Sequence, residues 1–243
     1  GIDPSSVEGL ADTPYGVPNR RFEYVMRHEA VPVGFWRSVG NSQNAFFAES
    51  FIDEMAHAAK QDPVAFRLAL LADKPRHRAV LEKAAQTAGW GTAAPAGRFR
   101  GVALHESFGS IVAEVAEISL DGGKTLRVHK VTCAIDCGRA MNPDTVVAQM
   151  ESGVVFGLTA AFYGEIMIKD GRVDQANFDT YPMLKLAQTP AIEVHIVESG
   201  AKLGGIGEPG TPPIAPAVAN ALFAATGTRI RSLPLVKNGI EPA

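Results

Sequence analysis

A loop rich in glycine and proline near the end of the chain restricts the fold more than any other stretch. Residues 204–213 contain four glycines and three prolines around a single carboxylate, Glu208. Glycine lets the backbone approach a neighbouring group closely, and proline fixes its direction, so the loop can hold Glu208 in one orientation. The prolines at 212–213 suit the first turn of a helix, and Gly227 suits its end. Glu208 is therefore expected just before a helix N-terminus, where backbone N–H groups favour anions.

The middle of the chain carries the pattern of antiparallel strands. Residues 101–105, 110–120 and 125–135 are rich in apolar residues, and the Asp-Gly-Gly sequence at 121–123 predicts a tight turn. Further strands are expected over 21–28, over both arms of a hairpin at 165–173, over 192–197 and over 229–235. Together with the predicted helices, these strands indicate an α+β fold.

Helices dominate the first part of the chain. Residues 44–60 place apolar side chains at helical spacing, Asp62 and Pro63 begin a second helix, and a third is expected over 75–88. The buried face of the first helix is expected to carry Phe47, Phe51, Ile52, Met55 and Ala59, with Glu49, Asp53 and Glu54 outside it.

A later helix is expected where Asn142 offers an N-cap and Pro143 a first helical residue. Gly153 and Gly157 fall on its predicted apolar face, and glycines there allow another backbone to approach closely. The other residues expected on this face are Val146, Met150 and Val154.

A short stretch of alanine, proline and glycine at 93–97 is the best candidate for a linker. At 243 residues the chain is long enough for one large domain or two smaller ones. The linker predicts two parts: residues 1–95, with helices and a loop that contains Trp36 and Arg37, and residues 96–243, an α+β part with the glycine–proline loop.

Composition limits the classes of partner and of metal site. The formal net charge is −3 and 46% of the residues are hydrophobic, so no nucleic-acid partner is expected. No apolar run looks long enough to span a bilayer, and the first residues, which lack a starting methionine, are expected to follow removed upstream sequence.

Cys133 and Cys137 would lie about 13 Å apart on one strand, too far for a disulfide. The six histidines are scattered singly and are expected to be structural.

Three segments, in this order, resemble the molybdenum hydroxylases, the xanthine oxidase family. The first is Phe-Trp-Arg-Ser-Val-Gly-Asn-Ser-Gln at 35–43, followed by Asp-Pro-Val-Ala-Phe-Arg at 62–67. The second is the strand, Asn-Pro turn and helix at 134–153, and the third is Gly-Ile-Gly-Glu-Pro at 205–209. The similarity is greatest to the large subunits of isoquinoline oxidoreductases and related aldehyde dehydrogenases. It implies the C-terminal part of a molybdopterin-binding domain of the xanthine oxidase and aldehyde oxidoreductase type, with mixed sheets and packed helices.

The resemblance implies an enzyme that hydroxylates an aldehyde or an N-heterocyclic carbon with oxygen derived from water. Glu208 corresponds to the family's base, which acts toward a molybdenum-bound hydroxyl group. Trp36 and Val39 would flank the substrate. Ser38 replaces the family's usual glycine, and the aliphatic Val39 cannot stack on a purine, which disfavours purine substrates. The residues expected at the cofactor are Arg37, Ser38, Gly40, Gly109, Ser110, Gln149 and Gly207.

The implied cofactor is molybdopterin cytosine dinucleotide, with no metal ligand from this chain. Iron–sulfur clusters would reside in a separate small subunit, because the two cysteines here cannot ligate them. The N-terminal part of the large subunit, in the same or a separate chain, would complete the site. A cytochrome c is a further candidate electron acceptor. Bacterial cytoplasmic, periplasmic and membrane-associated locations all stay open.

Other interpretations are open on the sequence alone. The glycine–proline stretch also suits a surface turn with a solvated glutamate, the tryptophan–arginine stretch suits an interfacial aromatic, and residues 108–110 suit a simple turn. Gln149 also suits a helix surface. A domain of the same fold without catalytic activity would serve cofactor binding or assembly. A hydrolase that pairs Glu208 with Asp136 or Glu165 would need the two carboxylates within a few ångströms of each other.

Overall fold

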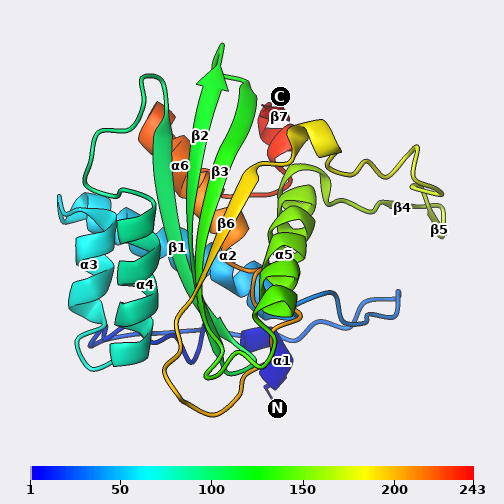
Figure 1. Ribbon diagram of the computed structural model, residues 1–243. Coiled ribbons are helices and arrows are strands. Elements are labelled where there is room, and N and C mark those ends of the chain that lie inside the picture. The colour runs from blue at the N-terminus through cyan, green and yellow to red at the C-terminus, as the bar shows by residue number, and fades with distance from the viewer. Residues whose placement is uncertain (1) are drawn as a thin grey trace.

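The computed structural model describes residues 2–243 and is built around one mixed sheet (Figure 1). Its strands are β1 (Phe99–Ser107), β2 (Ser110–Asp121), β3 (Thr125–Asp136), β6 (Ala191–Ile196) and β7 (Glu241–Pro242). β1, β2 and β3 are antiparallel neighbours, and β6 and the short β7 both pair with β3 in parallel. This sheet with its packed helices confirms the expected α+β class.

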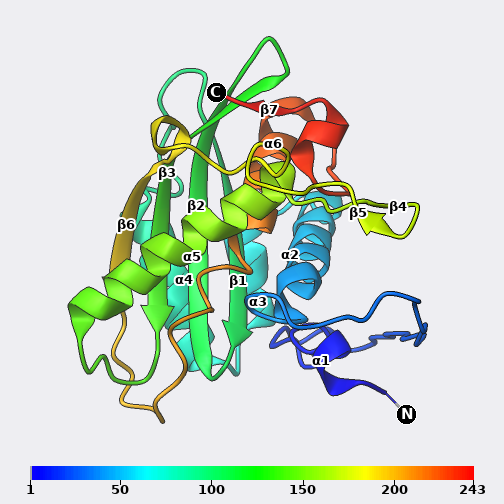
Figure 2. The ribbon, with the colours of Figure 1, turned by 90° about the vertical axis from the view of Figure 1, so that its right-hand side faces the viewer.

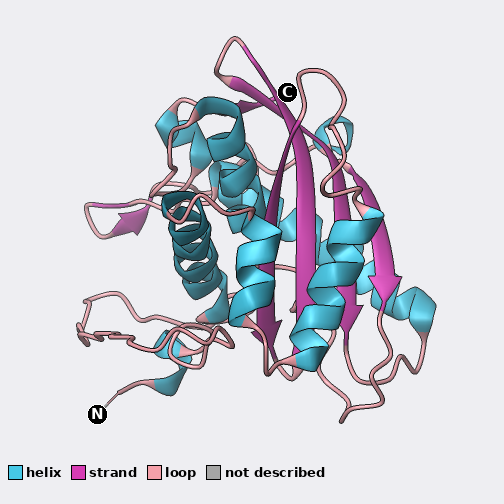
Figure 3. Cartoon of the chain, turned by 90° about the vertical axis from the view of Figure 1, so that its left-hand side faces the viewer, coloured by secondary structure: helices cyan, strands magenta, loops and turns pink. Residues whose placement is uncertain are grey.

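Helices lie on both faces of the sheet. They are α1 (Pro4–Val7), α2 (Asn41–Ala58), α3 (Pro63–Leu70), α4 (Pro75–Thr87), α5 (Pro143–Tyr163) and α6 (Ile214–Thr226). α5 and α6 cover one face (Figure 2), α3 and α4 cover the other (Figure 3), and α2 lies beside β1 and α6. The expected division at residues 95 and 96 falls in the loop between α4 and β1, and α4 packs on the sheet.

Side chains along β1, β2 and β3 alternate between two hydrophobic cores, one on each face. Val112 and Ala116 contribute to the core under α5 and α6, whereas Ile111 contributes to the core under α4. Burial on both faces explains why these strands read as nearly continuous apolar runs. Cys133 and Cys137 lie in the first core as free thiols, which confirms that they form no mutual disulfide.

The predicted ends of three helices are confirmed. Asp62 caps α3, where its Oδ1 accepts hydrogen bonds from two backbone N–H groups at 2.9 Å. Asn142 caps α5 by accepting a bond from the Thr145 N–H at 3.1 Å. Gly227 ends α6 with a left-handed φ of 71°. These signals are local, so the sequence alone suffices to read them.

The buried face expected for α2 is only partly right: Ile52 is buried and Met55 packs against the core as expected, but the positions of the phenylalanines and of two acidic residues are wrong. Phe47 and Phe51 are 53% and 60% exposed, whereas Glu49 and Asp53 are buried. The cause is Arg67 on α3, which is fully buried and donates from Nε to Glu49 Oε2 at 2.9 Å. Carboxylates can be buried when a buried cation and hydrogen bonds accompany them, so the charged face of α2 points inward.

The strand expected over 229–235 is also wrong. Arg229 reaches back to α2, where its Nη1 donates to Asp53 Oδ2 at 2.7 Å and its guanidinium lies 3.4 Å from the centre of the Phe223 ring. The chain therefore packs against α2 and α6, and its next element is the 3-10 helix η2 (Leu235–Asn238).

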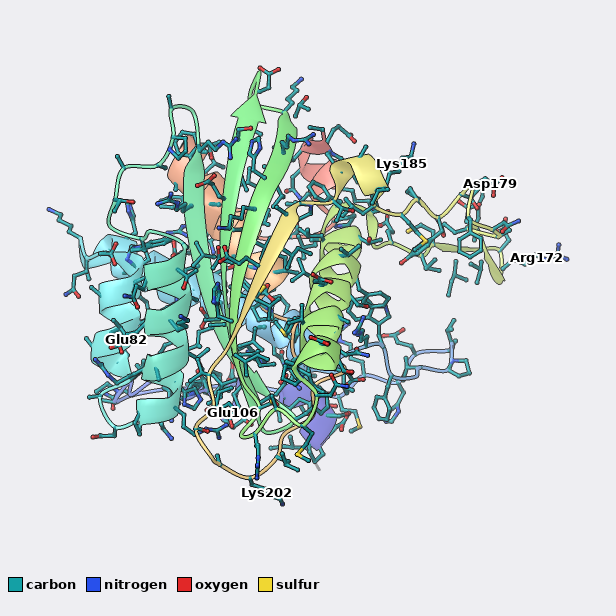
Figure 4. All side chains as sticks on the ribbon, viewed as in Figure 1. Glu82, Glu106, Arg172, Asp179, Lys185 and Lys202 are labelled. Atoms are coloured by element: carbon teal, nitrogen blue, oxygen red, sulfur yellow. The ribbon has the colours of Figure 1, made fainter. Side chains whose placement is uncertain are left out.

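Two segments project from the same side of the molecule, on the right of Figure 1. One is the chain around residues 20–35, and the strand expected at 21–28 is wrong, because no strand of residues 2–243 pairs with it. The other contains the predicted hairpin, confirmed as β4 (Ile168–Lys169) and β5 (Arg172–Val173), with the 3-10 helix η1 (Leu186–Gln188) after it. Arg172 and Asp179 mark this arm in Figure 4.

α5 corrects the expectation that no segment is long and apolar enough to span a bilayer. Its 21 residues are apolar enough to cross a membrane by that measure alone. In this fold the predicted apolar face, with Met150 and Val154, is buried in the core of the domain. α5 is thus a core helix that also supports the loop described next.

Candidate active site

The loop that carries Glu208 lies directly against α5. A side-chain carbon added at Gly153 would meet the carbonyl carbon of Gly210 at 3.0 Å, and one added at Gly157 would meet the carbonyl oxygen of Thr211 at 2.8 Å. Both positions of α5 therefore favour glycine, and the expectation that this face admits another backbone is confirmed.

Arg37 joins the tryptophan–arginine loop to both of these elements. Its Nε and Nη2 donate to the carbonyl oxygen of Gly207 at 3.0 and 2.5 Å. Its Nη1 donates to Ser152 Oγ at 3.1 Å, and its Nη2 also donates to Gln149 Oε1 at 3.2 Å. The structure thus brings together Arg37, Gln149 and Gly207, which the sequence singled out separately.

An aromatic pair supports the same junction. The rings of Trp36 and Phe156 stack with centroids 4.8 Å apart and an interplanar angle of 28°. The Arg37 guanidinium lies 5.3 Å from the centre of the Phe156 ring, within the range of a cation–π contact. Phe156 therefore contacts both side chains of the loop.

The two residues that directly follow Arg37 both have left-handed backbone conformations. Ser38 has a φ of 70° and the β-branched Val39 a φ of 53°, a region that favours glycine. The Ser38 hydroxyl donates to the Arg37 carbonyl oxygen at 2.5 Å and lies 2.6 Å from the Ser42 hydroxyl. Such conformations persist only where surrounding contacts hold them, so this loop has a fixed shape.

Gly40, directly after Val39, contacts the N-terminal segment. It is buried, its N–H donates to Glu8 Oε1 at 2.9 Å, and an added side-chain carbon would lie 1.8 Å from the Ser5 carbonyl oxygen. Gly40 therefore serves the packing of the N-terminal segment against the start of α2.

The turn between β1 and β2 supports the other end of the Glu208 loop. The Ser110 hydroxyl donates to the Gly205 carbonyl oxygen at 2.6 Å, and the Gly205 N–H donates to the Phe108 carbonyl oxygen at 2.8 Å. Gly109 is exposed beside them. Figure 4 shows this end of the sheet, where Glu106 on β1 and Lys202 on the loop after β6 lie close to the turn. The hydroxyl of Ser110 is thus engaged by the loop itself.

Glu208 is half-buried, and its backbone is fixed on both sides. The peptide before it is held through Gly207 by Arg37, and its own carbonyl oxygen accepts a bond from the Thr211 N–H at 2.9 Å. Within residues 2–243 its carboxylate makes no hydrogen bond or ion pair. A carboxylate held at its backbone and free at its oxygens suits proton transfer.

Sequence reasoning missed Ser152 and Phe156. Together with Gln149 they lie at i, i+3 and i+7 of α5, which is the spacing of one helix face. This spacing is the signal that could have found them once Gln149 was singled out. Their common partner, Arg37, is more than 110 residues away in the chain.

Two family models, both described as molybdopterin cofactor-binding domain, match the chain over residues 48–190 and 4–71. The first match alone covers more than half of the 243 residues. The chain belongs to the molybdopterin cofactor-binding domain family. Glu208 lies beyond both matched ranges, whereas Arg37 and the site residues of α5 lie within them.

Named relatives extend the comparison along the chain. The chain is 36% identical to the isoquinoline 1-oxidoreductase subunit beta of Brevundimonas diminuta, over 91% of this chain and 29% of that protein. It is 30% identical to a membrane-bound aldehyde dehydrogenase [pyrroloquinoline-quinone] of Gluconacetobacter polyoxogenes, over 83% of this chain and 29% of that protein. The chain thus spans 29% of the length of each of these relatives.

A solved structure supports the fold of this member of the molybdopterin cofactor-binding domain family. The aldehyde oxidoreductase from Desulfovibrio desulfuricans ATCC 27774 superposes with a TM-score of 0.63 at 14% identity. The superposition covers 82% of this chain and 40% of that chain. At this identity the similarity shows the fold alone, and it agrees with the α+β domain expected from the sequence.

The residues around Glu208 fit a bulky molybdopterin cofactor. Thr211 Oγ1 is buried with no hydrogen-bond partner in the described chain, so one polar atom beside the loop is left unsatisfied. A side-chain carbon added at Gly207 would have no neighbour closer than Gln149 Oε1 at 3.8 Å, and Gly109 is exposed. Open glycine backbone allows a ligand to approach the chain closely. Residues 2–243 contain no group of three or more histidine, cysteine and acidic side chains that could hold a metal ion.

The carboxylates considered for a hydrolase are engaged elsewhere. Asp136 Oδ2 accepts a bond from Arg76 Nε at 2.7 Å, and its Oδ1 accepts one from the Gly138 N–H at 2.8 Å. Burial would raise the pKa of Asp136, but its hydrogen bonds, led by that from Arg76, lower it. Glu165 pairs with Lys237. Within residues 2–243 neither carboxylate forms a hydrogen bond with Glu208, so nothing favours a paired-carboxylate hydrolase.

Proposed function

We propose that this chain is the C-terminal portion of a molybdopterin-dependent oxidoreductase that hydroxylates an aldehyde or an N-heterocyclic carbon with oxygen derived from water. The observation that carries this proposal is the presentation of Glu208. Its backbone is held by Arg37 through Gly207, while its carboxylate has no partner within residues 2–243. A group held in this way can accept a proton without first breaking a protein contact.

In this proposal the cofactor is molybdopterin cytosine dinucleotide, which supplies the oxidising metal centre and the oxygen that enters the product. The Glu208 carboxylate acts as general base and takes up one proton at a carboxylate oxygen. The exposed backbone of Gly109 and Gly207 faces the cofactor. The Thr211 hydroxyl is buried and has no partner within residues 2–243, so a bound water can satisfy it.

Trp36 and Val39 flank the substrate in this proposal. Val39 is aliphatic, so it contributes apolar contact but no aromatic stacking to a flat substrate. The names of the two relatives reported above refer to isoquinoline and to aldehydes. Both observations support a small aldehyde or N-heterocycle over a purine.

The remaining part of the large subunit, in the same or a separate chain, completes the site in this proposal. Electrons leave through iron–sulfur clusters of a small subunit, because Cys133 and Cys137 are both buried and no other cysteine is present in the chain. A cytochrome c is a candidate final acceptor.

The experiment is turnover by the complete native enzyme with an artificial electron acceptor, alongside metal and nucleotide analysis of the same preparation. We expect molybdenum and cytosine nucleotide in near-equal amounts, and oxidation of aldehydes or N-heterocycles in preference to purines. A preparation without molybdenum would indicate a non-catalytic domain of the same fold. Preferential oxidation of purines would contradict the proposed substrate class.

A further inference from the structure

The guanidinium of Arg37 is already occupied by the protein. Its three nitrogens all donate to protein acceptors: the Gly207 carbonyl oxygen, Ser152 Oγ and Gln149 Oε1. The ring of Phe156 lies 5.3 Å from its central carbon. An arginine that binds an anionic ligand presents its fork of N–H groups to that ligand, whereas this fork points at one carbonyl oxygen of the chain.

The acceptor of this fork is the peptide unit that leads into Glu208. The six atoms of a peptide unit, from the Cα of Gly207 to the Cα of Glu208, lie close to one plane. Two N–H groups of Arg37 hold the oxygen of this unit at 3.0 and 2.5 Å, so they also fix the direction in which Glu208 leaves the plane. On the other side, the Thr211 N–H holds the Glu208 carbonyl oxygen at 2.9 Å.

The backbone around Arg37 is also held in place by hydrogen bonds. Ser38 and Val39 directly after it have φ values of 70° and 53°, and the hydroxyls of Ser38 and Ser42 both donate to the Arg37 carbonyl oxygen, at 2.5 and 2.9 Å. At the other end, Gln149 and Ser152 are carried by the long helix α5. The arginine therefore links one fixed loop and the helix α5 to the glycine–proline loop that carries Glu208.

We propose that Arg37 is a positioning residue for Glu208, which it directs through the Gly207 carbonyl oxygen, and that its side chain does not bind the cofactor. Gln149, Ser152 and Phe156 hold the guanidinium in place for this role. The inference rests on the proposed function of Glu208 as the base.

A double-mutant cycle in the complete, cofactor-loaded enzyme separates the two roles of Arg37. Arg37→Lys keeps the charge but loses the fork, and misplacing a reacting group by about 1 Å costs up to about 100-fold in rate, so kcat is expected to fall by about that factor. Cofactor content and KM stay unchanged. In a Glu208→Gln background the same Arg37→Lys change lowers kcat by less than about threefold, because the carboxylate that Arg37 positions is already absent. Effects that multiply in the double variant, or loss of cofactor from Arg37→Lys, would overturn the proposal.

A second readout does not depend on turnover. Hydrogen exchange at the Thr211 amide, whose N–H donates to the Glu208 carbonyl oxygen, should become faster in Arg37→Lys and should be unchanged in the exposed control Arg127→Lys. In Arg37→Ala, added guanidinium ion should restore part of kcat by occupying the vacated position. Unchanged exchange in Arg37→Lys would show that the arginine does not hold the loop. Full activity of Glu208→Gln alone would instead overturn the proposed function, and the exchange measurement would still decide the role of Arg37.

Discussion

Trp36 lies stacked on Phe156, with the two ring centroids 4.8 Å apart. The stack joins the tryptophan–arginine loop to the middle of α5. The Arg37 guanidinium lies over the same Phe156 ring. One aromatic residue of α5 therefore supports two consecutive side chains of the loop that holds the Glu208 backbone.

Phe156→Leu should weaken this junction while keeping an apolar side chain on α5. We expect the free energy of unfolding to fall by about 1 kcal/mol, the usual contribution of an aromatic pair beyond its buried area. Urea unfolding of the complete protein measures the change. The matched control is Phe178→Leu, where the side chain is 78% exposed and should be neutral. Equal effects of the two variants would contradict a specific role for the stack.

The pH dependence of stability should report on His105. Burial lowers the pKa of His105 from its ordinary value of 6.5 to about 4. Its Nε2 lies 2.8 Å from Oδ1 of Asn41, the first residue of α2. As the pH falls from about 6.5 to about 4, the unfolded chain takes up a proton on this residue and the folded chain does not. The folded state should therefore lose up to about 3 kcal/mol across that window.

His105→Gln removes the titrating group but keeps a polar side chain. Unfolding curves between pH 7 and pH 4 should show a shallower loss of stability in this variant than in the natural protein. The exposed His28, changed to glutamine, serves as the control and should leave the slope unchanged. A slope that does not change in His105→Gln would contradict the assignment.

The buried ion network under α2 should be costly to break. Glu49 accepts bonds from Arg67 Nε at 2.9 Å, the Tyr15 hydroxyl at 2.7 Å and the Leu104 N–H at 3.0 Å. Glu49→Ala leaves the buried Arg67 with only its longer contact to Asp53 Oδ1, at 3.4 Å, and should lower the free energy of unfolding by about 3–5 kcal/mol. Glu54→Ala on the same helix, where the partner Arg231 is 69% exposed, should cost less than about 1 kcal/mol.

Equal losses in Glu49→Ala and Glu54→Ala would show that the network contributes no more than a surface ion pair. Chemical denaturation of both variants at neutral pH makes the comparison directly. The two glutamates differ in burial and partners but share a helix, so helix propensity cancels.

The parts of the fold that the sequence predicted depend on local chemistry. Asp62 and Asn142 form N-caps because their side chains reach backbone N–H groups of the next turn. The three long strands are readable because burial on both faces makes them apolar throughout. The glycine face of α5 was readable because Gly153 and Gly157 recur at helical spacing.

The parts that were not predicted depend on distant partners. The face of α2 could not be read because the charge that allows Glu49 to be buried comes from Arg67 on another helix. The strand expected over 229–235 failed for the same kind of reason, since Arg229 pairs with Asp53. At the site, Glu208 was predicted, but its connection to Arg37 through the Gly207 backbone leaves no signal in the residue types themselves.

The most direct measurement of the central claim is kcat of Glu208→Gln in the complete, cofactor-loaded enzyme. A general base contributes about 100- to 10,000-fold, so kcat should fall by at least about 100-fold while the molybdenum content stays that of the natural enzyme. Glu198→Gln, at an exposed glutamate of the same connection between β6 and α6, should retain normal turnover. Retention of most of the activity in Glu208→Gln, at full cofactor content, would contradict the account.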